Sequence, residues 1–506
     1  MAGIKSLAKD TVIYGLSSIV GRFLNWLLVP LYTITFAPDE YGVVTYMYSL
    51  VALAMAILTY GMETGFFRFA NHERWKDPME VYSTCLISIA TSSTAFVALV
   101  WMFLTPLSQS LECDGRPVYV LMMAICVAID AFTAIPYGYI RFRSRPMRFA
   151  VIRLVNIGLN IGLNLFFILL CPWLMKVAPA TVSWFYRPDF GIGYIFLANL
   201  IASAVNLLMM IPELTGFRWK FNTRLWREMI VYSAPLLVLS VAGIMNQTID
   251  KILYPYLVAD PAEAAYGLGI YGANYKVAVI MVMFLQAFRF AYEPFIFSRG
   301  KKGEDGKSEN RLQSYRDAMK YFIIFALLIF LGVMFYLNIV RHLISPKYYS
   351  GLDVVPVVML AELFFGIFFN LSLWYKLTDK TIWGMWFSLI GLSVTLLLNA
   401  VLVPRIGYMG CAIAAFFSYG TMMVASFFIG RWKYPVGYPL GRIGMYFLLA
   451  TVLYAAGMYA APLLLSETWL LWVVRPVLLA IYCLVVVKVE KIPLADTAKA
   501  LIKRFA

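Results

Sequence analysis

Long apolar runs, separated by short polar segments, follow one another along the whole chain. Fourteen runs can be marked, and each is close to the roughly 20 residues that a helix needs to cross a bilayer core. The first extends from Thr11 to Thr35, and the others cover residues 43–65, 82–106, 117–140, 148–172, 191–213, 227–250, 268–297, 318–341, 354–376, 380–403, 408–430, 443–465 and 469–487. The pattern predicts an all-α polytopic membrane protein with about 14 transmembrane helices.

The first run and its flanks indicate how the chain is oriented. Lys5 and Lys9 precede the run, and the acidic segment Pro38–Gly42 follows it. Because basic residues are enriched on the cytoplasmic side, the N-terminus is predicted to be cytoplasmic. The run is longer than the apolar core of a signal peptide, so cleavage is not expected.

A faint internal repeat indicates that the chain has two similar halves. The turn Glu40-Tyr41-Gly42 resembles Ile270-Tyr271-Gly272 near the midpoint, and repeats this faint are expected of transporters. The repeat predicts an N-terminal six-helix bundle at 1–213, a cytoplasmic linker at 214–226, a C-terminal six-helix bundle at 227–430, and two additional helices with a cytoplasmic tail at 431–506.

Composition supports the membrane assignment. Apolar residues make up 62% of the chain and the mean hydropathy is +0.77, whereas soluble proteins are about 45 to 50% apolar. With the fourteen helices in place, 30 of the 42 Lys and Arg fall in cytoplasmic segments, seven in outer loops and five in helices. The net charge of +15 therefore reflects topology rather than nucleic-acid binding, and the C-terminus is predicted to be cytoplasmic too.

Polar residues within the first and fifth runs are candidates for a substrate site. An ionisable side chain in mid-membrane costs about 2.5 to 3.5 kcal/mol, so it normally faces protein or a water-filled cavity. Arg22 and Asn25 occupy the first run. On the fifth, helical periodicity places one polar set on a single face, comprising Arg153, Asn156, Asn160 and Asn164. Gly158 and Gly162 on the opposite side are expected to pack closely on a neighbouring helix.

Four further ionisable residues lie within other apolar runs. The cations are Lys276 and Arg289 of the eighth run, where Arg289 is spaced to pair with Glu293. The acids are Asp130 of the fourth run and Glu362 of the tenth. Cations outnumber acids in this set, which favours an anionic ligand. The two carboxylates are the candidates for coupling transport to an ion.

Motifs of enzymes are missing from the sequence. Both histidines, His72 and His342, lie in or beside loops, and no nucleotide-binding, hydrolase or metalloprotease signature is present. The six cysteines are scattered without disulfide or metal-site spacing. The sequence therefore predicts no catalytic residue, metal or cofactor, and no ATPase of its own.

The N-terminal region resembles a known family of transporters. The stretch Lys5–Gly42, the Leu-Tyr-Thr sequence at Leu31–Thr33, Gly61 and the pair Arg68-Phe69 are similar to the start of Wzx-type polysaccharide and O-antigen flippases. These belong to the multidrug/oligosaccharidyl-lipid/polysaccharide exporter superfamily. The resemblance implies two six-helix bundles in a V around a central cavity, with helices 13 and 14 as additions.

The resemblance also implies a substrate and partners. The expected activity is flipping of an undecaprenyl-diphosphate-linked oligosaccharide across the bacterial cytoplasmic membrane, with Arg22, Arg153 and Lys276 facing the diphosphate. Membrane lipids, a glycan polymerase and assembly proteins are the expected partners. A lipid II flippase and a drug/cation antiporter of the same superfamily remain alternatives. An integral glycan polymerase or ligase is less favoured, because the outer loops are only about 20 residues long.

Overall fold

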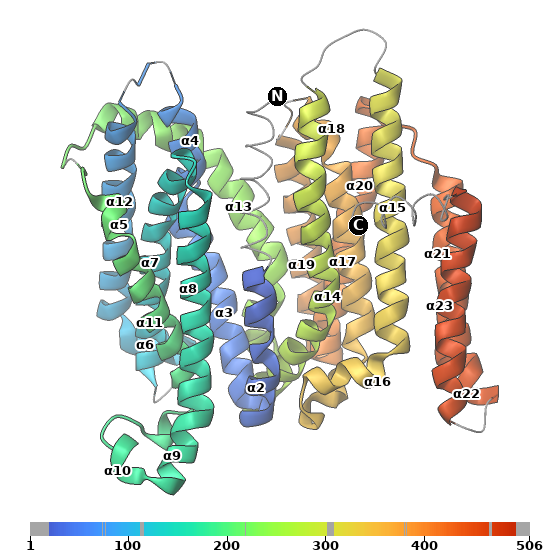
Figure 1. Ribbon diagram of the computed structural model, residues 1–506, viewed down its shortest axis with the longest axis horizontal. Helices are drawn as coiled ribbons and strands as arrows, with labels where there is room; N and C mark the ends of the chain where they lie inside the picture. Colours follow the sequence, from blue (N-terminus) through green and yellow to red (C-terminus); the bar gives the residue numbers. More distant parts are fainter. Residues whose placement is uncertain are drawn as a thin grey trace, which may run out of the picture. The chain divides into compact units, whose positions relative to one another are not determined.

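The computed structural model describes residues 20–72, 74–75, 77–111, 116–217, 219–300, 308–378, 380, 382–464 and 468–491. Within these residues the chain is almost entirely helical and contains no strand (Figure 1). Twelve helices are long and apolar enough to cross a membrane, a shorter apolar helix covers Gly193–Met209, and residues 20–35 belong to the first predicted run. Each of the fourteen predicted runs thus contains a helix, and the all-α class is confirmed.

The helix bounds follow the predicted runs closely. The first half comprises α2 (Leu28–Thr35), α3 (Pro38–Thr59), α4 (Met62–Ala70), α5 (Pro78–Met102), α6 (Leu104–Ser110), α7 (Pro117–Phe142), α8 (Pro146–Leu165), α9 (Cys171–Val177), α10 (Pro179–Val182), α11 (Gly193–Met209), α12 (Ile211–Leu214) and α13 (Thr223–Leu257). The second comprises α14 (Pro261–Gly300), α15 (Ser308–Phe335), α16 (Leu337–Val340), α17 (Val354–Leu371), α18 (Leu373–Leu377), α19 (Ile382–Ile406), α20 (Tyr408–Lys433), α21 (Leu440–Ala455), α22 (Ala461–Leu464) and α23 (Thr468–Glu490). The largest differences are longer helices at α13 and α14.

Local sequence explains where many helices begin. Proline stands in the first turn of α3, α5, α7 and α8, where its missing N–H has no intrahelical partner to lose. Asp77 and Asn222 cap α5 and α13 by accepting hydrogen bonds from Met79 N and Leu225 N, both at 3.0 Å. Between α3 and α4 the chain bends at Gly61, whose φ of +70° suits a residue without a Cβ.

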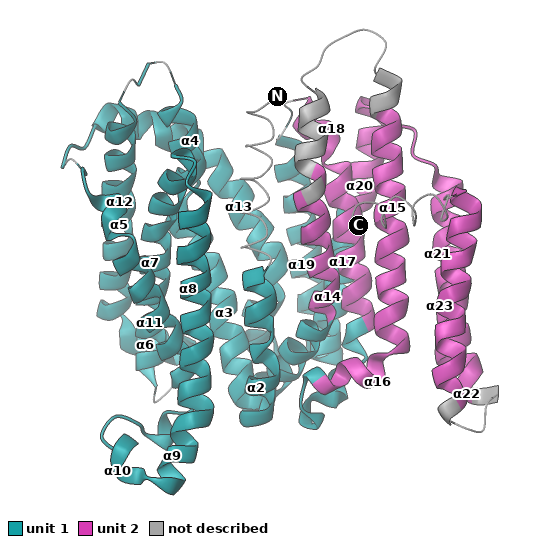
Figure 2. Cartoon of the chain, viewed as in Figure 1, with its two compact units in different colours: residues 1–277, 343–355, 380–422 teal, residues 278–342, 356–379, 423–506 magenta. Residues whose placement is uncertain are grey.

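The chain forms two compact units (Figure 2). Unit 1 comprises residues 1–277, 343–355 and 380–422, and unit 2 comprises residues 278–342, 356–379 and 423–506. Unit 1 thus joins helices from both predicted bundles. The division at 213, 227 and 431 that the repeat implies stays a prediction.

Within unit 1, α7 lies at the centre of the first helices. It packs against α3, α4, α5 and α11, and α13 packs against α3 and α19. At one end of these helices, Arg141 pairs with Glu63. Arg148 forms an ion pair with Glu213, in which Nε lies 2.5 Å from Oε1 and Nη2 donates to Oε2 at 3.0 Å. The same end carries the α4–α5, α7–α8 and α12–α13 connections, and the α2–α3 turn lies at the opposite end (Figure 1).

Within unit 2, the two C-terminal spans pack on α15. Glu490 of α23 accepts hydrogen bonds from Lys320 Nζ at 2.5 Å and from Tyr446 Oη of α21 at 2.6 Å. Tyr482 Oη of α23 donates to the carbonyl oxygen of Ile324 at 3.0 Å. The buried ion pair and these hydrogen bonds attach α21 and α23 to the rest of the unit.

Candidate substrate site

The helical residues 20–26, which precede α2 and are called the N-terminal helix below, contact two other helices of unit 1. A Cβ at Gly21 would overlap the side chain of Ile157, so α8 approaches this helix closely at the glycine. On α14, the carbonyl oxygen of Lys276 accepts a hydrogen bond from Trp26 Nε1 at 2.8 Å. The two contacts bring together three helices that carry predicted site residues.

Three basic side chains stand exposed near these contacts, and we refer to them as the basic set: Arg22, Arg153 and Lys276. Arg22 adjoins Gly21, and Arg153 lies one turn before Ile157. The predicted Asn25 is exposed as well. An exposed charge on a membrane-spanning helix is stable only beside water or a polar partner. The basic set therefore indicates the faces of these helices that contact water or polar groups rather than lipid.

Arg153 is joined to a polar network on α7 and α11. Its guanidinium lies 5.6 Å from the centre of the Tyr137 ring and interacts electrostatically with Asp130. Tyr137 Oη donates in turn to Asn206 Oδ1 at 2.8 Å. Asp130 and Arg153, predicted separately as a coupling acid and a substrate ligand, are therefore neighbours.

The asparagines of α8 bond to protein atoms. Asn156 Nδ2 donates to the carbonyl oxygen of Ala202 in α11 at 3.0 Å. Asn164 is fully buried, donates to Asn160 Oδ1 at 3.0 Å, and accepts from Tyr32 Oη at 2.9 Å. Part of the predicted polar face thus ties α8 to its neighbours.

The prediction for the opposite face of α8 is wrong. Gly158 and Gly162 are exposed, and a Cβ at either position would meet no described atom within 4 Å. The close contact of α8 with the N-terminal helix instead uses Gly21 and the side chain of Ile157. The four-residue spacing of Gly158 and Gly162 therefore did not predict which face of α8 packs against a neighbouring helix.

Unit 1 contains a second charged cluster, formed by Asp250 and Lys251, which the sequence did not predict. Lys251 Nζ lies 3.1 Å from both carboxylate oxygens of Asp250, and it also donates to the carbonyl oxygen of Gln247 at 3.1 Å. Tyr271 Oη donates to Asp250 at 2.7 Å, and the Tyr275 ring centre is 4.3 Å from the ammonium. Both charged residues are buried. The predicted run stops at residue 250, whereas α13 continues beyond it to Leu257.

The two segments compared in the repeat are helical, and the helices that carry them, α3 and α14, pack against each other. A Cβ at Gly42 would overlap the backbone of Ala265, and one at Gly269 would overlap the backbone of Pro38. Nearby, Lys347 Nζ donates to the carbonyl oxygen of Phe36 at 2.7 Å. These helices therefore meet at backbone contact, which only glycine allows.

The remaining predicted residues belong to unit 2. The guanidinium of Arg289 lies 4.4 Å from the centre of the Phe369 ring, and the ammonium of Lys376 lies 4.4 Å from the same centre. Lys376 was not predicted. Glu362 is buried within α17. The Glu293 side chain, the predicted partner of Arg289, lies outside the described residues.

Sequence comparison identifies the family. A family model described as polysaccharide biosynthesis protein matches residues 7–298, more than half of the chain. The chain belongs to the polysaccharide biosynthesis protein family. No curated protein matches its sequence. Membership agrees with the resemblance seen in the N-terminal residues.

Solved structures show which fold this family member has. A lipid II flippase, MurJ, in an inward closed conformation matches with a TM-score of 0.71 and 12% identity over 94% of this chain and 99% of its own. An inward-facing MATE multidrug resistance transporter of the MOP superfamily matches with a TM-score of 0.63 and 14% identity, over 84% and 94%. An outward-facing MATE multidrug resistance transporter matches with a TM-score of 0.56 and 14% identity, over 84% and 95%. The protein is a multi-pass membrane protein with the fold of MOP-superfamily transporters and flippases.

Proposed function

We propose that this protein flips an undecaprenyl-diphosphate-linked oligosaccharide across the bacterial cytoplasmic membrane by alternating access. The observation that carries the proposal is the basic set, three exposed cations on the N-terminal helical residues and on the two helices, α8 and α14, that they contact. A diphosphate is the part of such a lipid that needs cations within the membrane. The family description, polysaccharide biosynthesis protein, supports an oligosaccharide as the attached group.

Arginine is suited to this role. Its planar guanidinium gives two parallel, charge-assisted hydrogen bonds to phosphate oxygens, whereas lysine offers a point charge. Arg22 lies about 20 Å along the helix from the α2–α3 turn, at a rise of 1.5 Å per residue. Arg22 can therefore bind a diphosphate that lies deep in the membrane, far from the extracytoplasmic surface.

Charge gives the orientation that we propose. Basic residues crowd the end of unit 1 that carries the α4–α5, α7–α8 and α12–α13 connections, so we assign this end to the cytoplasm. The close contact between α3 and α14 at Gly42 and Gly269 then lies on the extracytoplasmic side. A thiol-reactive, membrane-impermeant probe should label Ala262→Cys in whole cells and Ser144→Cys only after lysis. Reversed labelling would overturn the orientation.

Substitution of the two arginines tests the substrate role. Arg22→Ala and Arg153→Ala should lower surface glycan about tenfold or more at normal protein abundance, since a hydrogen bond to a charged group contributes about 1.5 to 3 kcal/mol. Arg22→Lys should retain part of the export. Arg187→Ala, at an exposed position in an outer loop, is the matched control. Normal export in both alanine variants would exclude the proposed binding role.

Asp130 is the carboxylate that we propose for ion coupling. Its neighbour Arg153 belongs to the basic set, so a proton on Asp130 would remove a negative charge that competes with the diphosphate for the guanidinium. Glu362, buried in unit 2, is the other candidate. Asp130→Asn should make export independent of the proton gradient, while Glu362→Gln should leave it gradient-dependent. The reverse result would move the coupling role to Glu362, and gradient dependence in both variants would exclude both residues.

Lipid II is the alternative substrate, because the similarity to the lipid II flippase structure extends over more of the chain than those to the MATE structures. Expression in cells depleted of their lipid II flippase distinguishes the two substrates. The proposal expects no rescue of growth, and rescue would favour lipid II. A drug/cation antiporter would instead protect cells from cationic dyes.

A further inference from the structure

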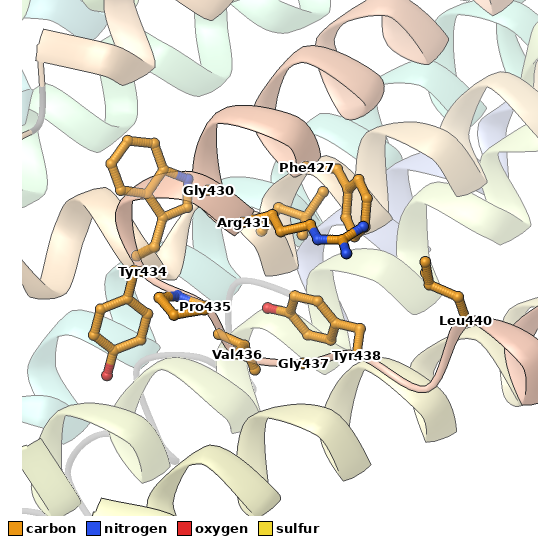
Figure 3. Close-up of a pocket in the computed structure, with 11 residues that line it drawn as sticks. Phe427, Gly430, Arg431, Tyr434, Pro435, Val436, Gly437, Tyr438 and Leu440 are labelled. Atoms are coloured by element: carbon orange, nitrogen blue, oxygen red, sulfur yellow. The ribbon is translucent and has the colours of Figure 1, made fainter.

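Two adjoining pockets lie within unit 2, at the connection between α20 and α21. The first encloses about 280 Å³ around the segment Tyr434–Leu440 (Figure 3). The second encloses about 390 Å³ between α15, α17, α20 and α21. Both are lined by the same four residues where they meet, namely Leu371, Phe427, Tyr438 and Leu440. The two pockets therefore form one continuous site.

The two pockets differ in chemistry. The second is lined almost wholly by apolar side chains, and its volume lies in the range of about 300 to 1,000 Å³ that is typical of small-ligand sites. Three of its lining residues are strongly exposed, Val424, Phe428 and Leu440, so the pocket opens toward the membrane. The first pocket is lined by the charged residue Arg431 together with Tyr434 and Tyr438, and Figure 3 shows the Tyr434 hydroxyl pointing away from Arg431.

The polar pocket is held in shape by hydrogen bonds. Arg316 Nε of α15 donates to the carbonyl oxygen of Val436 at 2.6 Å, and Tyr434 N donates to the carbonyl oxygen of Gly430 at 2.8 Å. Gly437 takes a φ of +73°, which lets the segment turn back toward α21. Because these bonds fix the segment, the first pocket is already formed without a ligand.

The position of the site along the helices defines what can enter it. Arg431 and Lys433 end α20, and Trp432 beside them is 77% exposed, as is usual for an aromatic residue at a membrane surface. An apolar pocket that opens to the membrane and adjoins a cationic pocket at a helix end matches a lipid with a negatively charged headgroup. Basic pockets between transmembrane helices are known to bind such headgroups.

We propose that this site binds an anionic glycerophospholipid of the membrane. The headgroup phosphate accepts hydrogen bonds from Arg431 and the Tyr438 hydroxyl, and one acyl chain fills the apolar pocket. The walls come from α15, α17, α20 and α21, so the bound lipid joins the first of the two additional spans to the helices before it. The proposal is independent of the substrate that the protein transports.

Binding of defined lipids to the purified full-length protein tests the proposal. Phosphatidylglycerol added to the detergent-solubilised protein should bind and raise its thermal unfolding temperature, and phosphatidylcholine with the same chains should bind at least tenfold more weakly. Arg431→Gln should abolish this difference, since a charge-assisted hydrogen bond is lost. Lys433→Gln is the matched control, because it removes the same charge from a residue that does not line either pocket.

A second variant tests the apolar pocket. Ile367→Trp should fill it and weaken phosphatidylglycerol binding about tenfold while Arg431 remains in place. Equal binding of both lipids, or unchanged binding in Arg431→Gln, would overturn the proposal. Displacement of phosphatidylglycerol by an equimolar amount of undecaprenyl phosphate would also overturn it, since the pocket would then be a subsite for the polyprenyl chain.

Discussion

Lys251 and Lys276 are the same residue type on neighbouring helices, yet their surroundings differ completely. Lys251 is 8% exposed and bonds to Asp250 and to the carbonyl oxygen of Gln247. Lys276 is exposed, and its backbone carbonyl accepts the hydrogen bond from Trp26. The comparison shows two uses of charge within a membrane-spanning region. The buried pair on α13 is bonded to Tyr271 of α14 and so stabilises the packing of these two helices, whereas an exposed cation can meet a ligand.

The glycines of unit 1 also differ in their surroundings, since some stand at close helix contacts and others face open space. Gly42 and Gly269 stand where α3 and α14 meet, and a methyl group at either would overlap the facing backbone. Gly158 on α8 faces open space. Unit 1 is thus closely packed around the α3–α14 crossing and open along one face of α8. Under the proposed orientation, the packed part closes the extracytoplasmic side.

The largest expected effect is on stability, from breaking the buried pair. Lys251→Met should lower the free energy of unfolding by about 3 to 5 kcal/mol, because it leaves the Asp250 carboxylate buried without its cation. Denaturant unfolding of the purified protein measures the loss. The double variant Asp250→Asn/Lys251→Met should recover much of it. A single variant as stable as the wild type would show that the pair contributes nothing.

A smaller effect on stability is expected at the helix crossing. Gly42→Ala should cost about 1 to 3 kcal/mol, because the methyl group forces α3 and α14 apart. The matched control, Gly158→Ala, should instead stabilise the protein by about 0.5 to 1 kcal/mol through better helix propensity. The same unfolding measurement compares the two. If both variants shifted in the same direction, the assigned contrast in packing would be wrong.

The smallest expected effect on stability belongs to the exposed lysine. Lys276→Met should change the free energy of unfolding by less than about 0.5 kcal/mol, as is usual for exposed substitutions. Surface glycan should nevertheless fall several-fold if the basic set holds the diphosphate. A loss of stability comparable to that of Lys251→Met would assign Lys276 to the packed region instead.

The sequence alone determined the number of spans and most of their bounds. A bilayer leaves a helix no water to bond with, so a spanning segment must satisfy its own backbone over about 20 apolar residues. That requirement is local, and it is why the runs from 43–65 to 469–487 all reappear as helices. Two acids and three cations within those runs were also visible as candidates, and the family could be recognised from the first residues.

Which helix faces meet was decided only by the tertiary structure. In a membrane, lipid is as apolar as a packed neighbour, so apolar periodicity does not distinguish a buried face from a lipid-facing one. This is why Gly158 and Gly162 were assigned to a contact that Gly21 makes instead. Three further features likewise depend on how the helices pack: the proximity of Arg153 to Asp130, the burial of Lys251, and the position of the Lys376 ammonium beside the Phe369 ring. Each membrane helix satisfies its backbone hydrogen bonds by itself, so the local sequence determines that it forms. The side-chain contacts between helices exist only after the helices have packed.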